Sequence, residues 1–167
     1  MLAGVQANGE TVNSKTSVDY LKFNEINPSE FLPLLNSQKI RKHLIEHDLF
    51  TIETLTAWMS SKVEVNATSG CKVRGIVCEG ELVGWCGIQL EDEKYEIAII
   101  IDDKFWGLGK QVFQDMMCWA KELSHDDVYI NFLHTRPDYK FLKKISKSVS
   151  EIELFGSKFT SYQLTVK

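Results

Sequence analysis

Residues Ile97 to Ile101 form an unbroken apolar run that would place hydrophobic side chains on both faces of a strand. Because successive side chains of a strand point to opposite faces, such a strand is covered on both sides and lies at the centre of its sheet. Two β-branched segments, Lys72 to Cys78 and Leu82 to Leu90, precede it, and Glu79-Gly80-Glu81 joins them with hairpin residues. The sequence therefore predicts an antiparallel hairpin followed by a central strand over 95–101.

The other elements follow from apolar periodicity and from helix and strand end signals. Asn27-Pro28-Ser29-Glu30 opens a helix that carries apolar residues as far as Ile45, and a second helix begins near Thr51. The remaining predictions are a first strand over 18–26, a helix from Lys110, a strand over 128–133, a helix opened by Pro137, and strands over 151–155 and 159–166. The order is β-α-α-β-β-β-α-β-α-β-β, an α/β (α+β) arrangement with about seven strands and about four helices. Residues 1–16 are expected to be a loose tail, and 17–167 a single domain.

Composition restricts the partners of this chain of 167 residues. Lys and Arg number 19 against 23 Asp and Glu, and no basic tract is present, which argues against a nucleic-acid partner. No apolar run approaches bilayer length, and Met1 to Lys15 lack signal-peptide features, so we expect a cytoplasmic protein with no membrane partner. The 4 cysteines show no zinc-site spacing, and we expect four buried thiols and no metal.

The segment that follows the central strand places two glycines, Gly107 and Gly109, before a long amphipathic helix. Glycines let a backbone approach a ligand, and the free N–H groups at a helix N-terminus attract anions such as phosphate. Lys104 and Lys110 flank the loop and would add positive charge. The alternative is a tight strand-to-helix turn without a ligand. Gln111 excludes a Walker loop and Val112 a dinucleotide fingerprint, because neither supplies the required residue.

Lys104-Phe105-Trp106-Gly107-Leu108-Gly109 resembles the phosphate loop of the GCN5-related N-acetyltransferase (GNAT) family, in which Arg or Gln is followed by two residues, Gly, one residue, and Gly or Ala. The stretch from Tyr95 through Trp106-Gly107 is most similar to the branch that acetylates ribosomal-protein N-termini. The element order between Val18 and Val166 also resembles the family's order. The resemblance implies a GNAT fold with a mixed, mostly antiparallel sheet.

The resemblance also implies acetyl transfer from acetyl coenzyme A (acetyl-CoA). In the family, the loop equivalent to Trp106 through Lys110 cradles the pyrophosphate of coenzyme A. The strand equivalent to Ile99, Ile100 and Ile101 splays from the next strand, 128–133, and its backbone pairs with the pantetheine arm. We therefore expect the cofactor to contact Ile99, Ile100 and Ile101 and the loop residues Lys104, Phe105, Trp106, Gly107, Leu108, Gly109 and Lys110.

Transfer to an amine needs a base for the ammonium and an acid for the departing thiolate. Glu96 is the first candidate base, with pairing to a cross-strand cation as the alternative. His134 is the second, with a solvated loop histidine as the alternative. The family often uses a tyrosine as the acid, but Lys143 stands at that position. Tyr139, one turn earlier, is the remaining candidate acid, or else a packing residue.

The acceptor is expected to be a primary amine on a small molecule or a peptide N-terminus. A homodimer is one of the assemblies that we consider for this chain. Family likeness assigns the acceptor pocket to Arg41, His43, Glu46, His47, Asp48, Trp58 and Tyr162. The charge is unevenly distributed, because residues 1–103 hold 9 basic and 16 acidic side chains and 104–167 hold 10 and 7. This pattern agrees with an anionic cofactor at the C-terminal half. The alternative functions are an acyl-CoA-binding module without turnover and a purely structural domain.

Overall fold

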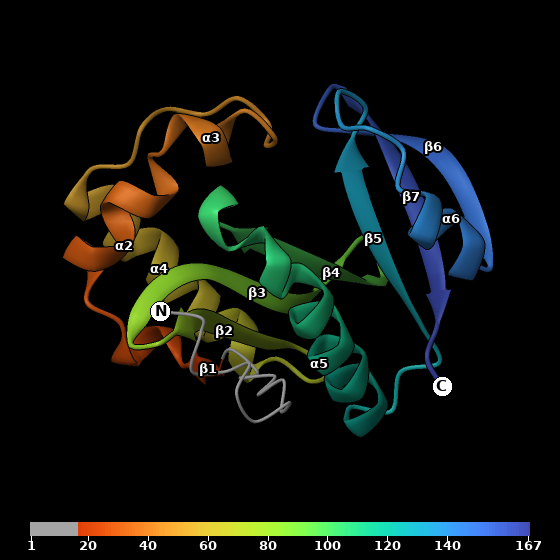
Figure 1. Ribbon diagram of the computed structural model, residues 1–167, viewed down its shortest axis with the longest axis horizontal. Helices are drawn as coiled ribbons and strands as arrows, with labels where there is room; N and C mark the ends of the chain where they lie inside the picture. The colour runs from red at the N-terminus through yellow and green to blue at the C-terminus, as the bar shows by residue number, and fades with distance from the viewer. Residues whose placement is uncertain (1–16) are drawn as a thin grey trace, which may run out of the picture.

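Figure 1 shows the computed structural model, which describes residues 17–167. Within these residues one sheet contains seven strands in the order β1-β2-β3-β4-β5-β7-β6. The strands are β1 (Val18–Leu21), β2 (Lys72–Cys78), β3 (Glu81–Glu91), β4 (Lys94–Ile101), β5 (Asp127–Leu133), β6 (Ser148–Leu154) and β7 (Ser157–Thr165). All neighbours are antiparallel except β4 and β5, which run parallel. The predicted mixed, mostly antiparallel sheet and its central strand β4 are confirmed. The predicted tail lies outside the described residues.

Helices cover the two faces of this sheet. The helices α2 (Pro28–Leu35), α3 (Gln38–Arg41) and α4 (Ile52–Ala67) lie on one side, and α5 (Gly109–Glu122) lies on the other (Figure 1). A fifth helix, α6 (Lys140–Ile145), is short and precedes the last hairpin. Two 3-10 turns are η1 (Phe23–Glu25) and η2 (Asp103–Leu108). No helix in residues 17–167 is both long and apolar enough to span a membrane.

The first predicted helix is divided into two, so residues 17–167 contain five α-helices where the sequence predicted about four. Helix α2 ends at Leu35 because the side chain of the next residue, Asn36, is held by the backbone of Phe50. The Asn36 amide accepts a hydrogen bond from the Phe50 N–H at 2.8 Å and donates one to the Phe50 carbonyl at 2.9 Å. Ser37 then adopts an extended conformation before α3 begins. The prediction of a helix as far as Ile45 was therefore wrong. Strand 18–26 and the helix from Pro137 are also shorter than predicted.

Two clusters of buried side chains stabilise the sheet, one on each face. The cluster under α5 contains Val112, Met116 and Ala120, which have no exposed surface, so the predicted apolar stripe of this helix is confirmed. The prediction of four buried thiols was wrong for one cysteine. Cys118 is exposed, because it projects from α5 two residues after Met116 and therefore from the opposite side of the helix.

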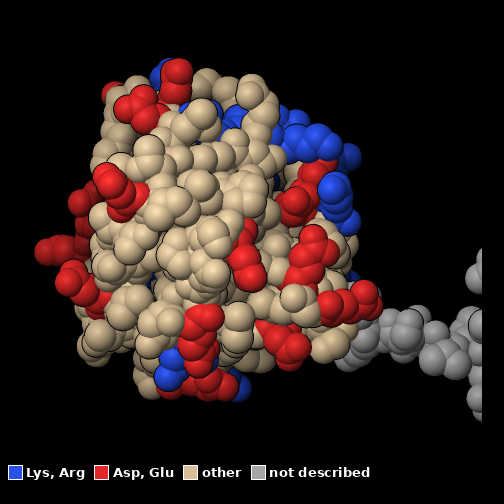
Figure 2. All heavy atoms as spheres, turned by 90° about the vertical axis from the view of Figure 1, so that its left-hand side faces the viewer, with Lys and Arg blue, Asp and Glu red and all other residues tan. Residues whose placement is uncertain are grey.

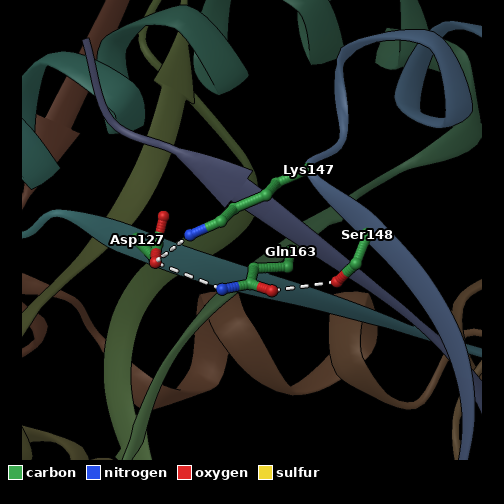
Figure 3. Close-up of polar contacts among 4 residues, drawn as sticks. All are labelled: Asp127, Lys147, Ser148 and Gln163. Carbon is green, nitrogen blue, oxygen red and sulfur yellow. Dashed lines mark hydrogen bonds and ion pairs between the residues drawn. The ribbon is translucent and has the colours of Figure 1, made fainter.

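The last two strands form a hairpin that joins the sheet through β5. Its turn places Phe155 at φ 50° and Gly156 at φ 76°, the positive angles of a tight hairpin turn. At the other end of the hairpin, Gln163 donates to Asp127 at 3.1 Å and accepts from Ser148 at 2.9 Å, while the Lys147 ammonium lies 3.4 Å from Asp127 (Figure 3). These contacts tie β5, β6 and β7 in register.

Candidate active site

The strands β4 and β5 separate towards their carboxyl ends. Their only registered pair is Glu96 with Tyr129, near the start of both strands, and beyond it the two strands diverge (Figure 1). The backbone of β4 after Glu96 therefore lacks a partner on the β5 side, and a gap opens in the middle of the sheet. The gap predicted between residues 99–101 and 128–133 is present.

A cavity of about 650 Å³ lies in this gap. Its walls come from α3 and the residues after it, from β4, η2, α5 and β5, and from α6 with the segment that leads into it. Of the ten residues predicted to contact the cofactor, six line it: Ile99, Ile100, Ile101, Trp106, Gly109 and Lys110. Phe105 and Leu108 instead pack against the core cluster under α5 and so hold the loop in place. Lys104 and Gly107 are exposed on the loop, outside the cavity wall.

The mouth of the cavity is the N-terminus of α5. Leu108 stands at its N-cap position and gives the helix no side-chain hydrogen bond, so the first turn of α5 faces the cavity without a side-chain cap; the N–H of Gly109 donates to the carbonyl of Trp106 in the preceding turn. Gly107 and Gly109 have no positive φ, and a Cβ at either would meet no atom within 4 Å. Neither backbone conformation nor internal packing therefore requires glycine at these two positions. What their small size provides is open space in front of the helix N-terminus, which suits a phosphate group.

Glu96 lies where the strands begin to separate, but its side chain faces a second, smaller cavity of about 220 Å³. Asn131 donates to its carboxylate at 3.1 Å. Burial raises the pKa of Glu96 above its ordinary value, and the hydrogen bond from Asn131 opposes this shift only in part. Its cross-strand neighbours are Gln89 and Tyr129, so the alternative of a cross-strand ion pair is wrong.

The two other candidate catalytic residues lie in different surroundings. Tyr139 lines the larger cavity, where its hydroxyl oxygen accepts a hydrogen bond from Arg136 at 2.7 Å and its ring packs on Phe132. His134 is exposed and lines neither cavity, and its Nδ1 lies 3.1 Å from the carbonyl oxygen of Lys158. Lys143 points into solvent, 3.4 Å from Asp138. Tyr139 therefore lies in the gap between β4 and β5, and Glu96 lies at the narrow end of this gap. His134 lies outside it.

The proposed acceptor residues do not form one pocket. His43 lines the larger cavity, but Tyr162 is only 1% exposed and cannot contact an acceptor. Trp58 packs among Phe23, Phe31 and Trp85. Figure 2, which faces the α2–α4 side of the molecule, shows acidic side chains spread over the face around a largely neutral area, with most of the visible basic ones at one upper edge and a few at the lower edge. Within residues 17–167, no three potential metal ligands come together.

Asn131 was missed in the sequence, although an amide in the otherwise apolar strand 128–133 was a usable signal. Its partner Glu96 is 35 positions away. The side chains meet because the parallel register sets Glu96 against Tyr129, two residues from Asn131 on the same face of β5. The residues next to Glu96 and Asn131 in the sequence do not predict this strand register.

Neither a protein-family model nor a curated protein matches the sequence. Solved structures match the fold over most of the chain. A GnaT-family acetyltransferase of Bordetella pertussis has a TM-score of 0.74 at 13% identity, covering 90% of this chain and 98% of that one. A Salmonella typhimurium acetyltransferase, described as modifying the N-terminal serine of a ribosomal subunit protein, gives 0.67 at 15% identity, with 92% and 97% covered.

A microcin self-immunity acetyltransferase, solved in complex with acetyl-CoA and AMP, gives a TM-score of 0.68 at 12% identity, covering 92% of this chain and 94% of that one. The fold is therefore that of the GNAT acetyltransferases, as the loop resemblance predicted. At these identities the likeness concerns the arrangement of the backbone. The chemistry has to be inferred from the side chains in the gap.

Proposed function

We propose that this protein transfers an acetyl group from acetyl-CoA to a primary amine on a small molecule or a peptide N-terminus, by direct attack in a ternary complex. The observation that carries the proposal is the cavity between β4 and β5 with the N-terminus of α5, which no side chain caps, at its mouth. The microcin self-immunity acetyltransferase, which shares the fold and was solved with acetyl-CoA, supports the choice of donor.

The residues around the cavity fit the parts of this donor. The N–H groups at the start of α5, with Lys110 beside them and Lys104 on the exposed loop, would hold the pyrophosphate. The backbone of Ile99 and Ile100, which has no strand partner on the β5 side, would bind the pantetheine arm, while the apolar walls exclude water from it. Acetyl-CoA supplies a thioester, whose carbonyl carbon accepts the amine nitrogen. A backbone N–H of β4 would stabilise the developing oxyanion.

Glu96 and Tyr139 would carry the two proton transfers. Because burial raises its pKa, Glu96 is better matched to accepting a proton near neutral pH than an exposed carboxylate is. The hydroxyl oxygen of Tyr139 already accepts from Arg136, so its own proton is free to be donated to the departing thiolate. His134 takes no part in this proposal, because it lies outside both cavities.

The second candidate function is an acyl-CoA-binding module without turnover. The favouring observations are that Glu96 and Tyr139 line different cavities and that Lys143, at the position of the family's tyrosine, points into solvent. Both functions share the cofactor site and differ only in whether chemistry occurs.

Calorimetric titration with coenzyme A tests what the two functions share, and we expect one site per chain. Gly107→Glu should abolish this binding, because it places a carboxylate next to the pyrophosphate. Lys121→Glu is the matched control, since it adds negative charge at the far end of α5. Thiol release from acetyl-CoA with a panel of amines and peptides separates enzyme from module. Absence of coenzyme A binding would refute both, and binding without release across the panel would favour the module.

A further inference from the structure

The guanidinium of Arg136 lies over the cavity without an acidic partner. It stacks above Phe132, with 4.4 Å from Cζ to the ring centroid, and donates from one Nη to Tyr139. Its Nε is buried and has no hydrogen-bond partner. The ion pairs found within residues 17–167 leave Arg136 without a carboxylate. A shielded cation with an unsatisfied donor is costly to fold, so its presence at a cavity wall indicates a site for an anion.

His43 approaches the same place from the opposite wall of the cavity. Its Nε2 is also buried without a partner, and its ring centroid is 6.1 Å from that of Trp106. Burial first, and then the charges of Arg136 and Lys42, lower the pKa of His43. The other cation on this wall, Lys39, lies 3.0 Å from Asp103 and is already paired. Arg136 and His43 therefore each present one buried nitrogen without a hydrogen-bond partner at the wall of the same cavity.

We propose that Arg136 and His43 bind a carboxylate of the acceptor, so that the acceptor is a small amine of the amino acid type. This inference rests on the proposed acetyl transfer. The two buried nitrogens suit a small, singly charged group, whereas the phosphates of coenzyme A are expected at the exposed loop around Lys104 and Lys110. The surrounding apolar side chains, among them Leu44, Ile130 and Phe132, exclude water and strengthen a charge-assisted hydrogen bond.

The acceptor side of the inference is tested with matched amines. Phenylalanine, leucine and methionine are each compared with the amide in which the carboxylate is neutralised and with the amine that lacks it, and thiol release gives kcat/KM. Losing one charge-assisted hydrogen bond lowers kcat/KM roughly 10- to 100-fold. We expect that preference for the acids, and equal values for the three forms would overturn the inference. The proposed function would survive that result, because the neutral amines would still be acetylated.

The variant Arg136→Gln should remove the preference for the acids and leave the Kd of coenzyme A unchanged. Lys144→Gln is the control, since it removes a positive charge from α6 at an exposed position outside the cavity. If Arg136→Gln weakens coenzyme A itself to the same extent, the anion belongs to the cofactor and the inference is wrong.

A binding readout covers the case in which none of these amines turns over. In the presence of coenzyme A, the imidazole signals of His43 are followed by NMR during titration with an N-acetyl amino acid and with its amide. A bound carboxylate favours the protonated ring, so the acid should raise the pKa of His43 and the amide should not. The same response to both ligands, or a response to neither, would refute the inference.

Discussion

Gly109→Ala should separate the folding of this protein from its cofactor binding. The glycine has φ −55°, which alanine adopts without strain, and a Cβ there meets no atom within 4 Å. Replacing such a glycine stabilises a fold by about 0.4–1 kcal/mol, because it restricts the unfolded chain. For a chain of this size that raises Tm by roughly 1–4 °C. The folded protein without ligand should therefore become more stable.

With coenzyme A bound, the wild type should instead be more stable than Gly109→Ala. Ligand at about 100 times its Kd stabilises the wild type by about 2.7 kcal/mol, which is roughly 5–11 °C in Tm. The added methyl group enters the cavity in front of α5, and loss of one charge-assisted hydrogen bond costs about 1.5–3 kcal/mol. If Kd weakens about 100-fold, the same ligand concentration stabilises the variant by only about 0.4 kcal/mol.

Thermal melts with and without coenzyme A measure both effects in one experiment. Gly84→Ala is the control, because a Cβ there overlaps the carbonyl oxygen of Ile100 and should lower Tm under both conditions. If Gly109→Ala lowers the Tm of the free protein, the fold needs this glycine and the cavity argument fails. A full ligand shift in the variant would show that coenzyme A binds elsewhere.

Three further outcomes follow from individual side chains. Burial raises the pKa of Glu96, so its ionisation lowers folding stability as the pH rises above the ordinary carboxyl value of about 4.3; the Tm of Glu96→Gln relative to wild type should therefore rise as the pH is raised above about 4, and a difference that stays constant with pH contradicts this. Tyr139→Phe should lower kcat by roughly 100-fold or more with an unchanged Kd for coenzyme A, and an unchanged kcat would exclude it as the acid. Cys118 is exposed and Cys86 fully buried, so mass spectrometry after brief thiol labelling of the native protein should find Cys118 modified and Cys86 untouched, whereas rapid labelling of Cys86 would contradict this packing.

The helices and strands were predictable wherever the residues of a short segment determine its conformation by themselves. The hairpin of β2 and β3, the central strand β4 and the stripe of α5 were correct, since alternation and helical spacing report directly on which side chains are buried. The failures lie where a distant residue intervenes. Asn36 ends α2 by binding Phe50, 14 positions away, and no pattern around Asn36 announces that partner.

The sequence alone determined the order of the strands along the chain, the buried centre of the sheet, and the glycine-bearing segment that leads into α5. Only the tertiary structure decided which side chains meet in the gap between β4 and β5. In the structure Asn131 donates a hydrogen bond to Glu96, Arg136 and His43 line the same cavity, and His134 lies outside it. The physical reason is that local structure depends on neighbours along the chain, whereas a site depends on the register and divergence of strands that are far apart in sequence.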